Sequence, residues 1–263
     1  EVDYIDPDRR EDARERINTW VEDATDDLIQ DLIPADALSE DSRMVLVNAL
    51  HLKASWTSPL TTGTGPFVTA DGDEIEVETL SGATSTWYED ELCRATALGT
   101  YGNDLSLALV QPVDDLPTVL DGWSEAAEDP SAGLGAMLEA LAGGGEPVAL
   151  TVPAFDIDWD TLLSSVLSEL GIADAFGPGL ADFSGITTDE ELFLAEVIQK
   201  AVITVDEEGM EAAAATAVVM DTSSAQAEPK ELTLDAPFLF VAYETSTRAP
   251  LVLGWIGDPA QTR

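Results

Sequence analysis

The sequence predicts an α+β fold, in which helices accompany large, mostly antiparallel β-sheets. Strand and helix patterns do not alternate regularly along the chain, and strands dominate its last third, which disfavours a doubly wound parallel sheet. Hydrophobic residues make up 45% of the 263 residues. That much apolar surface can offset the entropy of ordering the chain. We therefore expect a folded protein with a single domain over residues 1–263.

The first half of the chain predicts one helix and then a series of strands. Residues 7–32 have the pattern of an amphipathic helix, which Pro34 stops. The apolar positions at helical spacing are Ile17, Trp20, Val21, Ala24 and Leu28. The apolar run 44–52 predicts a buried strand. Shorter strand-like runs follow at 66–69, 74–80, 94–98, 105–112 and 147–155.

Helix patterns return at 116–127, 131–142 and 160–170. A glycine run that begins at Gly143 stops the second of these, and Gly171 stands at the C-cap position of the third. Strand patterns then cover 192–205, 231–243 and 250–257. This uneven order of elements is the main basis of the α+β prediction.

The charge of the chain excludes two classes of partner. The sequence has 52 acidic and 11 basic side chains, a formal charge of −41. Binding to nucleic-acid phosphates or to an anionic membrane needs clustered Lys and Arg, so we expect neither partner. The acidic residues interleave with apolar ones instead of forming a tail. Because salt screens the mutual repulsion of such a surface, we interpret it as a halophilic adaptation.

Cysteine content and hydropathy exclude further features. Cys93 is the single cysteine, so we expect neither an internal disulfide nor a thiolate metal site, and no cofactor is predicted. No run approaches the roughly 20 apolar residues that cross a bilayer, and the N-terminus opens on charge instead of a signal-peptide pattern. We expect a soluble monomer at an extracellular or cell-surface location, with the cytoplasm as the alternative.

The sequence does not support an enzyme. His51 is the only histidine, and its place in the apolar run 44–52 favours a buried structural residue over the base of a Ser-His-Asp triad. No nucleophile elbow, Walker loop or H-E-x-x-H motif is present. Among 52 acidic residues some carboxylate, such as Asp182, will always suggest acid/base chemistry, so such pairs carry little weight.

The most informative segment, 204–220, is compatible with two structures. Four consecutive alanines after Glu211 favour a helix over 210–217. In an extended strand Glu211 would lie on one face, and the opposite, uncharged face would contain Met210, Ala212, Ala214, Thr216, Val218 and Met220. Gly209 immediately precedes this stretch and would supply the backbone freedom of a hinge. The residues alone leave both structures open.

Five motifs occur in an order and at a spacing that identify a family. They are residues 17–21 (INTWV), 46–56 (LVNALHLKASW), 181–186 (ADFSGI), 205–216 (VDEEGMEAAAAT), and 234–240 (LDAPFLF) with 250–254 (PLVLG). Together they resemble the serpins, a family of serine protease inhibitors, and cover essentially the whole chain. The chain looks like a prokaryotic or archaeal serpin whose N-terminal helices have no counterpart here, so we expect an N-terminally incomplete domain.

The resemblance implies a serpin fold with an exposed reactive-centre loop at about residues 207–231. A protease would cleave this loop, and its N-terminal side would insert as a strand of the large sheet while the protease is held as an acyl-enzyme. The implied hinge residues are Glu207, Glu208, Gly209, Met210, Glu211, Ala212, Ala213, Ala214, Ala215 and Thr216. Met210, where inhibitory serpins usually have Thr or Ser, would have to enter the sheet first.

Counting from Gly209 as in the family places the cleaved bond at Ser223–Ser224, with a bond after Met220 as the alternative. A small polar residue suits subtilisin-, elastase- or chymotrypsin-like serine proteases and argues against a trypsin-like target. A cysteine protease is a further alternative partner. The other functions that remain open are a non-inhibitory serpin acting as a chaperone or binding protein, and an inactive fragment.

The resemblance also implies a region where the sheet opens, formed by Asn48, Trp56 and Gln199. Gln199 replaces a histidine that many serpins pair with the asparagine matched by Asn48, and an amide can replace that hydrogen bond in part. Ala154 replaces a common basic partner of the glutamate matched by Glu207. We therefore expect one restraint on the hinge to be missing.

Overall fold

The computed structural model describes residues 9–35, 37–38, 42, 44–129, 131–189, 191–210 and 228–260. The chain divides into two compact units. Unit 1 comprises Glu1–Leu52 and Ile157–Ile203, and unit 2 comprises Lys53–Asp156 and Thr204–Arg263. The single domain expected from the sequence stays a prediction. None of the described helices is long and apolar enough to cross a membrane.

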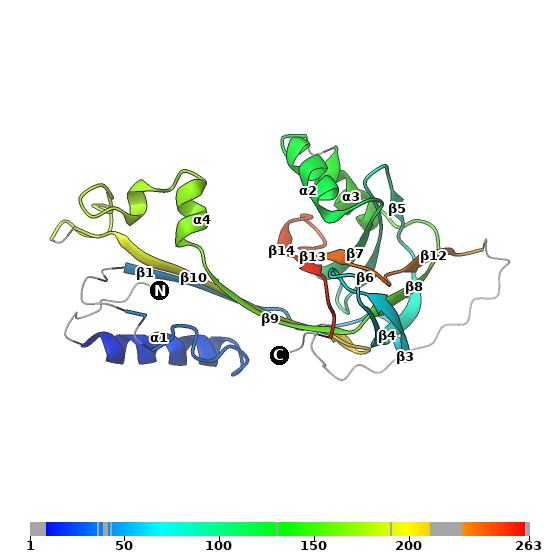
Figure 1. Ribbon diagram of the computed structural model, residues 1–263, viewed down its shortest axis with the longest axis horizontal. Coiled ribbons are helices and arrows are strands. Elements are labelled where there is room, and N and C mark those ends of the chain that lie inside the picture. The colour runs from blue at the N-terminus through cyan, green and yellow to red at the C-terminus, as the bar shows by residue number, and fades with distance from the viewer. Residues whose placement is uncertain are drawn as a thin grey trace. The chain divides into compact units, whose positions relative to one another are not determined.

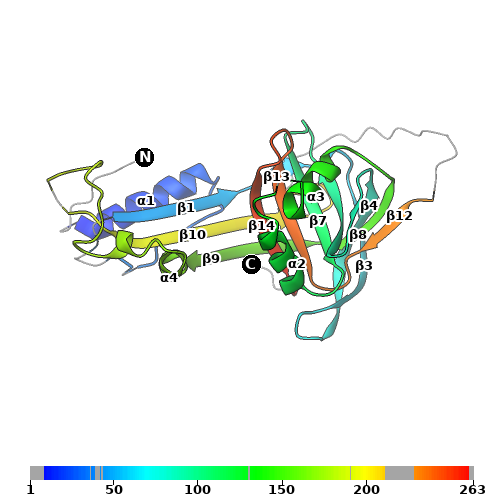
Figure 2. The same ribbon diagram turned by 90° about the horizontal axis from the view of Figure 1, so that it is seen from above.

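Unit 1 is built around strands β1 (Met44–His51) and β10 (Leu194–Val205), which pair in parallel. Strand β9 (Phe155–Leu162) pairs with β10 on its other edge, so that Figure 2 shows β1, β10 and β9 side by side in this order. Figure 1 shows helix α1 (Arg10–Ala24) on one side of these strands and α4 (Ser164–Glu169) on the other. A short 3₁₀ turn, η2 (Asp174–Phe176), follows α4.

The core of unit 1 lies between α1 and the parallel strand pair. It contains Val21, Ile29, Leu32, Ile33, Leu38, Ile198 and Val202. Asn18 of α1 is buried and fastens the chain that follows the helix: its Nδ2 donates to the carbonyl of Ile33 (3.0 Å), and its Oδ1 accepts from Ile33 N–H (2.9 Å). These two bonds satisfy the buried amide completely enough for it to lie in an apolar core.

Helix α1 is shorter than the sequence pattern predicts, because it ends at Ala24 instead of continuing to residue 32. Asp26 and Asp27 have φ angles of 51° and 63°, in the left-handed region that ends a helix. The Thr25 hydroxyl donates to the carbonyl of Val21 (2.8 Å) and satisfies one of the last helical acceptors. The apolar residues beyond the helix still pack into the core, which explains why the pattern continued.

Unit 2 contains two sheets whose faces pack together. One has the order β12-β8-β4-β3, with β3 (Thr61–Val68), β4 (Glu74–Thr84), β8 (Val148–Pro153) and β12 (Lys230–Thr233). The other has the order β14-β13-β7-β6-β5, with β5 (Tyr88–Glu89), β6 (Cys93–Gly99), β7 (Leu105–Pro112), β13 (Phe238–Glu244) and β14 (Pro250–Ile256). Apart from the parallel pair β12–β8, the neighbouring strands of these sheets are antiparallel.

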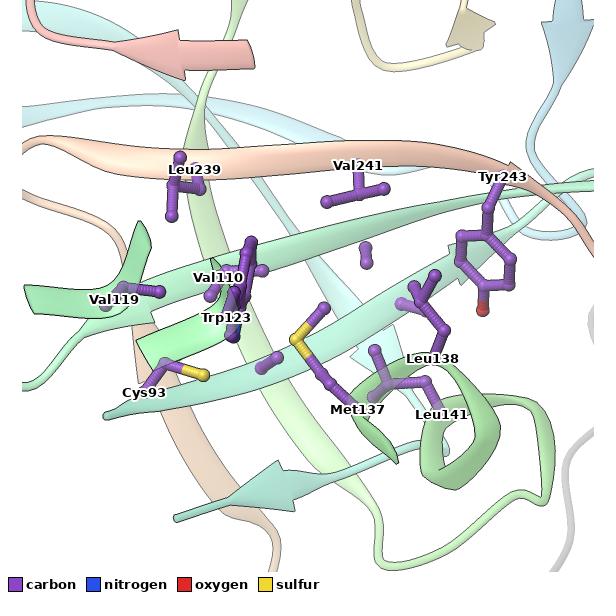
Figure 3. Close-up of a cluster of buried hydrophobic side chains, with 13 residues drawn as sticks. Cys93, Val110, Val119, Trp123, Met137, Leu138, Leu141, Leu239, Val241 and Tyr243 are labelled. Atoms are coloured by element: carbon purple, nitrogen blue, oxygen red, sulfur yellow. The ribbon is translucent and has the colours of Figure 1, made fainter. Parts of the chain in front are cut away.

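The sheet with the order β14-β13-β7-β6-β5 packs against a different set of apolar side chains on each of its faces. Helices α2 (Leu116–Glu125) and α3 (Gly133–Ala142) cover one face, where Figure 3 shows Trp123, Met137 and Leu138 against Val110 and Val241. On β13, Leu239, Val241 and Tyr243 belong to this cluster, as the two-residue period of a strand requires. The other face of β13 carries Phe238 and Phe240, which contact Phe67 of β3 and Phe155.

The structure therefore confirms the α+β fold with mostly antiparallel sheets. Besides the end of α1, several sequence predictions are wrong in their boundaries. The expected strand 147–155 divides at Ala154 into β8 and β9, and the expected strand 231–243 divides around Pro237 into β12 and β13. The expected helix 160–170 shrinks to α4, because β9 continues to Leu162.

Candidate functional site

The candidate site is the turn that leads from β10 into the predicted hinge. Strand β10 ends at Val205, and the chain returns as a two-residue strand, β11 (Gly209–Met210). Val205 and Met210 are antiparallel partners, and Asp206 N–H donates to the carbonyl of Gly209 (3.1 Å). Glu207 and Glu208 thus form the tip of a tight hairpin. A short connection of this kind fixes the register of the returning strand.

Strand β11 lies between two other strands of the sheet. It pairs on one side with β10 and on the other with β2 (Ala54–Ser55), in the register Gly209↔Ser55 and Met210↔Ala54. Both residues of β11 are buried, and Met210 has no exposed surface. The sequence expectation that Met210 has still to enter the sheet needs correction, since Met210 is already a strand residue in this structure.

Trp56 and the residues after it hold the carbonyl groups of the turn. The indole Nε1 of Trp56 donates to the carbonyl of Asp206 (2.8 Å), and its backbone N–H donates to the carbonyl of Glu208 (2.9 Å). Leu60 N–H donates to the carbonyl between them, that of Glu207 (2.9 Å). The indole is almost completely buried. Three consecutive carbonyl groups of the hinge turn are therefore held by one short segment of chain.

Gly209 is required by a close approach of two backbones. A Cβ atom at this position would overlap the carbonyl oxygen of Ala54 and lie 2.8 Å from Ser55 Cα. Gly209 is absent from the glycines with positive φ, so the left-handed conformation is not what this position needs. The sequence predicts the backbone freedom of a hinge at Gly209; in the described structure the glycine is needed for steric reasons, and its hinge role stays a prediction.

Asp206 is the one residue of the turn that sequence reasoning missed. Its carboxylate Oδ1 accepts hydrogen bonds from the backbone N–H groups of Glu208 (2.8 Å) and Gly209 (2.9 Å). The signal was available in the sequence, because an Asp that precedes a Gly by three residues is typical of such turns. The turn therefore depends on a side chain outside the predicted hinge, which began at Glu207.

Glu207 lies half-buried at the tip of the turn. Within the described ranges its carboxylate makes no ion pair, and Ala154 replaces the basic residue that would be its partner. The contact that holds Glu207 is the backbone hydrogen bond from Leu60. The sequence led us to expect that one side-chain restraint on the hinge is missing. The backbone hydrogen bond from Leu60 provides part of such a restraint.

Asn48 and Gln199 are register partners across β1 and β10. Asn48 is exposed and Gln199 half-buried, and in the part of the chain that the structure describes no hydrogen bond joins the two side chains. The backbone ladder from Met44↔Leu194 to His51↔Val202 holds these strands together. A role of the two amides in sheet opening stays a prediction.

The remaining predicted loop residues lie outside the described residues. They are Glu211, Ala212, Ala213, Ala214, Ala215, Thr216, Ser223 and Ser224. The described chain resumes at Glu228, shortly before β12. The choice between a helical and an extended structure for this segment stays open.

The other residues considered for chemistry show no catalytic arrangement. His51 is half-buried at the end of β1, less enclosed than the sequence led us to expect. Asp182 accepts from Ser184 N–H (3.1 Å), and hydrogen bonds from Ser184 lower its pKa, as in an ordinary turn. Burial, with the nearby Asp90, raises the pKa of Cys93 to about 12, so its thiol is neutral and unreactive at neutral pH. Among the described residues no cluster could hold a metal ion.

Replacing Trp56 by phenylalanine should loosen the hinge turn. A smaller aromatic ring remains, but the partly buried carbonyl of Asp206 loses its donor, which costs about 1–3 kcal/mol. We expect the urea midpoint to fall without a change in the denaturant slope. Trp20→Phe is the matched control, because Trp20 is half exposed, and this control should leave the midpoint unchanged. Equal stability of the two variants would contradict the role of the Trp56 indole.

Comparison with known proteins finds one family along the whole chain. The family model described as Serpin (serine protease inhibitor) matches residues 1–259. An uncharacterized serpin-like protein of Methanosarcina acetivorans is 36% identical over an aligned length of 273 residues, and the alignment covers 98% of this chain and 61% of the relative. The leukocyte elastase inhibitor of Homo sapiens is 31% identical, with 95% and 67% covered. The crystal structure of native protease nexin-1 with heparin is 29% identical, with a TM-score of 0.77, and covers 98% of this chain and 69% of that chain.

The matched relatives are longer than this chain. It spans between 59% and 63% of the length of four curated relatives that match 98% of it. The shared part includes the hinge turn and the sheets described above, because the matches cover nearly all of this chain.

Proposed function

The chain belongs to the serpin family, and on this premise we propose that it inhibits a serine protease as a suicide substrate. A protease would cleave the loop that follows β11, and the loop residues after Met210 would then extend β11 as a new strand. The protease would be trapped as an acyl-enzyme. The observation that carries this proposal is the position of β11, which already pairs with β10 and with β2.

The partners of β10 indicate where the new strand would go. Strand β9 occupies one edge of β10 along much of its length, as contacts such as Asp158–Lys200 (3.0 Å) and Asp156–Thr204 (2.9 Å) show. Strand β1 pairs with β10 along Leu194–Val202, and β11 pairs with β10 at Val205. We propose that β11 would grow along the edge of β10 that β1 occupies now. Growth of β11 beyond Met210 would therefore separate β1 from β10.

The exchange of partners is favourable on simple grounds. At present β1 and β10 form a parallel pair, whereas β11 runs antiparallel to β10. An inserted strand would replace one parallel ladder by antiparallel pairing, which is slightly more stable per residue, and would satisfy the backbone groups of the loop itself. The fully buried Met210 sets the face on which the even-numbered, uncharged loop residues would follow.

We further propose that the target is an elastase-, subtilisin- or chymotrypsin-like protease that cleaves at Ser223–Ser224. Small side chains at the cleaved bond fit shallow specificity pockets, and one relative is named as an inhibitor of leukocyte elastase. The test is incubation with each of these proteases, followed by denaturing electrophoresis and mass spectrometry. We expect a denaturant-stable complex and a released peptide that begins at Ser224. Cleavage by every protease without a complex would instead indicate a non-inhibitory serpin.

The acidic composition supports the separate proposal that the protein works in high salt. The charge of −41 is spread over a chain with only 11 basic residues. At about 1 M salt the screening length falls to roughly 3 Å, which removes most of the repulsion. A gain of about 2 kcal/mol would raise the thermal midpoint by roughly 4–8 °C. We expect such a rise of the thermal midpoint between 0.1 and 2 M NaCl, measured by circular dichroism. The proposal does not require a comparable rise with sucrose, which is uncharged and does not screen charges. A midpoint that does not change with NaCl concentration would contradict the proposal.

A further inference from the structure

We infer that Asp206 is a positioning residue for loop insertion, because its carboxylate builds the turn that sets the register of the incoming strand. This inference rests on the inhibitory function proposed above. It concerns a residue that precedes the predicted hinge and that would contact neither the protease nor the cleaved bond.

Four hydrogen bonds connect Asp206 to the turn and its surroundings. Its Oδ1 accepts from the N–H groups of Glu208 (2.8 Å) and Gly209 (2.9 Å). Its own N–H donates to the carbonyl of Gly209 (3.1 Å), and its carbonyl accepts from Trp56 Nε1 (2.8 Å). Gly209 is buried, so without the carboxylate its N–H would lose its acceptor in a place that water does not reach freely.

The turn decides which side chains face the interior. With two residues at the tip, Met210 pairs with Val205 and turns its side chain into the interior. The alternation of a strand then places even-numbered loop residues on the buried face and Glu211 on the opposite face. A slip of one residue would exchange the faces and direct Glu211 inward. Asp206 disfavours this slip, because its carboxylate binds the backbone N–H groups of Glu208 and Gly209, which define the turn.

The chemistry of the contact suggests which substitutions keep the function. Both hydrogen bonds run to a single oxygen, Oδ1, so they need an acceptor and not a negative charge. Asparagine presents an oxygen at the same place, and alanine presents none. Asp129 offers a control outside the hinge, since it is exposed and its Oδ1 likewise accepts a hydrogen bond from a backbone N–H group, that of Ser131 (2.9 Å).

The test compares Asp206→Ala, Asp206→Asn and Asp129→Ala with the unchanged protein against the protease that gives the complex. The quantity measured is the number of inhibitor molecules consumed per complex formed. We expect this number to rise about tenfold for Asp206→Ala, as slower insertion lets the acyl-enzyme hydrolyse, and to stay near the original value for the other two. The rate of first cleavage should be equal in all four. Amide exchange at Gly209 should be faster in Asp206→Ala alone.

The possible failures are distinguishable. If the unchanged protein forms a complex and Asp206→Ala consumes no more inhibitor, or if Asp206→Asn is as poor as Asp206→Ala, the inference is wrong while the proposed function stands. If the unchanged protein forms no complex with any protease, the proposed function fails. The inference is then decided by the gain in thermal midpoint after loop cleavage, which must be smaller for Asp206→Ala than for Asp206→Asn. If Asp206→Ala does not fold, Asp206→Ser replaces it, because serine has a shorter side chain and a weaker acceptor. The number of inhibitor molecules that Asp206→Ser consumes per complex must then lie between the tenfold rise expected for alanine and the value for Asp206→Asn.

Discussion

If the chain inhibits a protease as we propose, replacing Met210 by arginine should make it a substrate of that protease instead. Met210 is fully buried and pairs with Val205 and Ala54, so a guanidinium there would have to leave water. The effective penalty for burying an unpaired ion is several kcal/mol. The arginine variant is therefore expected to expel β11 from the sheet, and the cleaved loop could not insert past this position.

The measurement for Met210→Arg is the yield of denaturant-stable complex together with the yield of cleaved inhibitor. We expect cleavage to continue while the complex disappears. Met210→Thr is the matched control, because threonine is uncharged, favours strands, and should keep most of the complex. If the arginine variant forms complex as efficiently as the threonine variant, the buried strand position of residue 210 has no part in inhibition.

Replacing Gly209 by alanine should destabilise the intact protein by about 1–3 kcal/mol, since overpacking forces the backbone to shift. The added methyl group would overlap the carbonyl oxygen of Ala54 and lie 2.8 Å from Ser55 Cα. Both obstacles are backbone atoms of β2, which cannot move aside as a flexible side chain could. The expected result is a lower urea midpoint with an unchanged slope.

Gly185→Ala is the control for this substitution. A Cβ atom at Gly185 meets nothing within 4 Å, and its φ lies outside the positive range. The control should therefore stay within about 0.5 kcal/mol of the original stability. A Gly209→Ala variant that is as stable as Gly185→Ala would show that β2 and β11 are not packed as described.

Much of the fold could be predicted from local patterns. The strand at 105–112 and the strand at 250–257 match β7 and β14 closely, because alternating or continuous apolar runs mark them. The end of α1 was missed because the apolar period continues beyond Asp26 and Asp27, whose backbone conformations are what stop the helix. The apolar pattern indicates which residues are buried, and in this part of the chain the buried residues continue beyond the end of the helix.

The sequence indicates where the candidate site lies, but it does not predict that β11 is already paired in the sheet. The motif around Gly209 predicts a hinge, and the turn at Asp206 is a local feature that the spacing of Asp206 and Gly209 indicates. The burial of Met210 depends on β2, and the indole of Trp56 reaches Asp206 across 150 positions of sequence. Contacts of that range leave no periodic signal, so only the three-dimensional structure shows that β11 is already in the sheet.

The central claim is that β11 grows along β10 once the loop is cleaved. The most direct test is the thermal midpoint of the protein before and after a single cut in the loop, with both fragments retained. Insertion should raise the midpoint by more than about 10 °C, equivalent to several kcal/mol. A midpoint that stays the same or falls after the cut would contradict the claim.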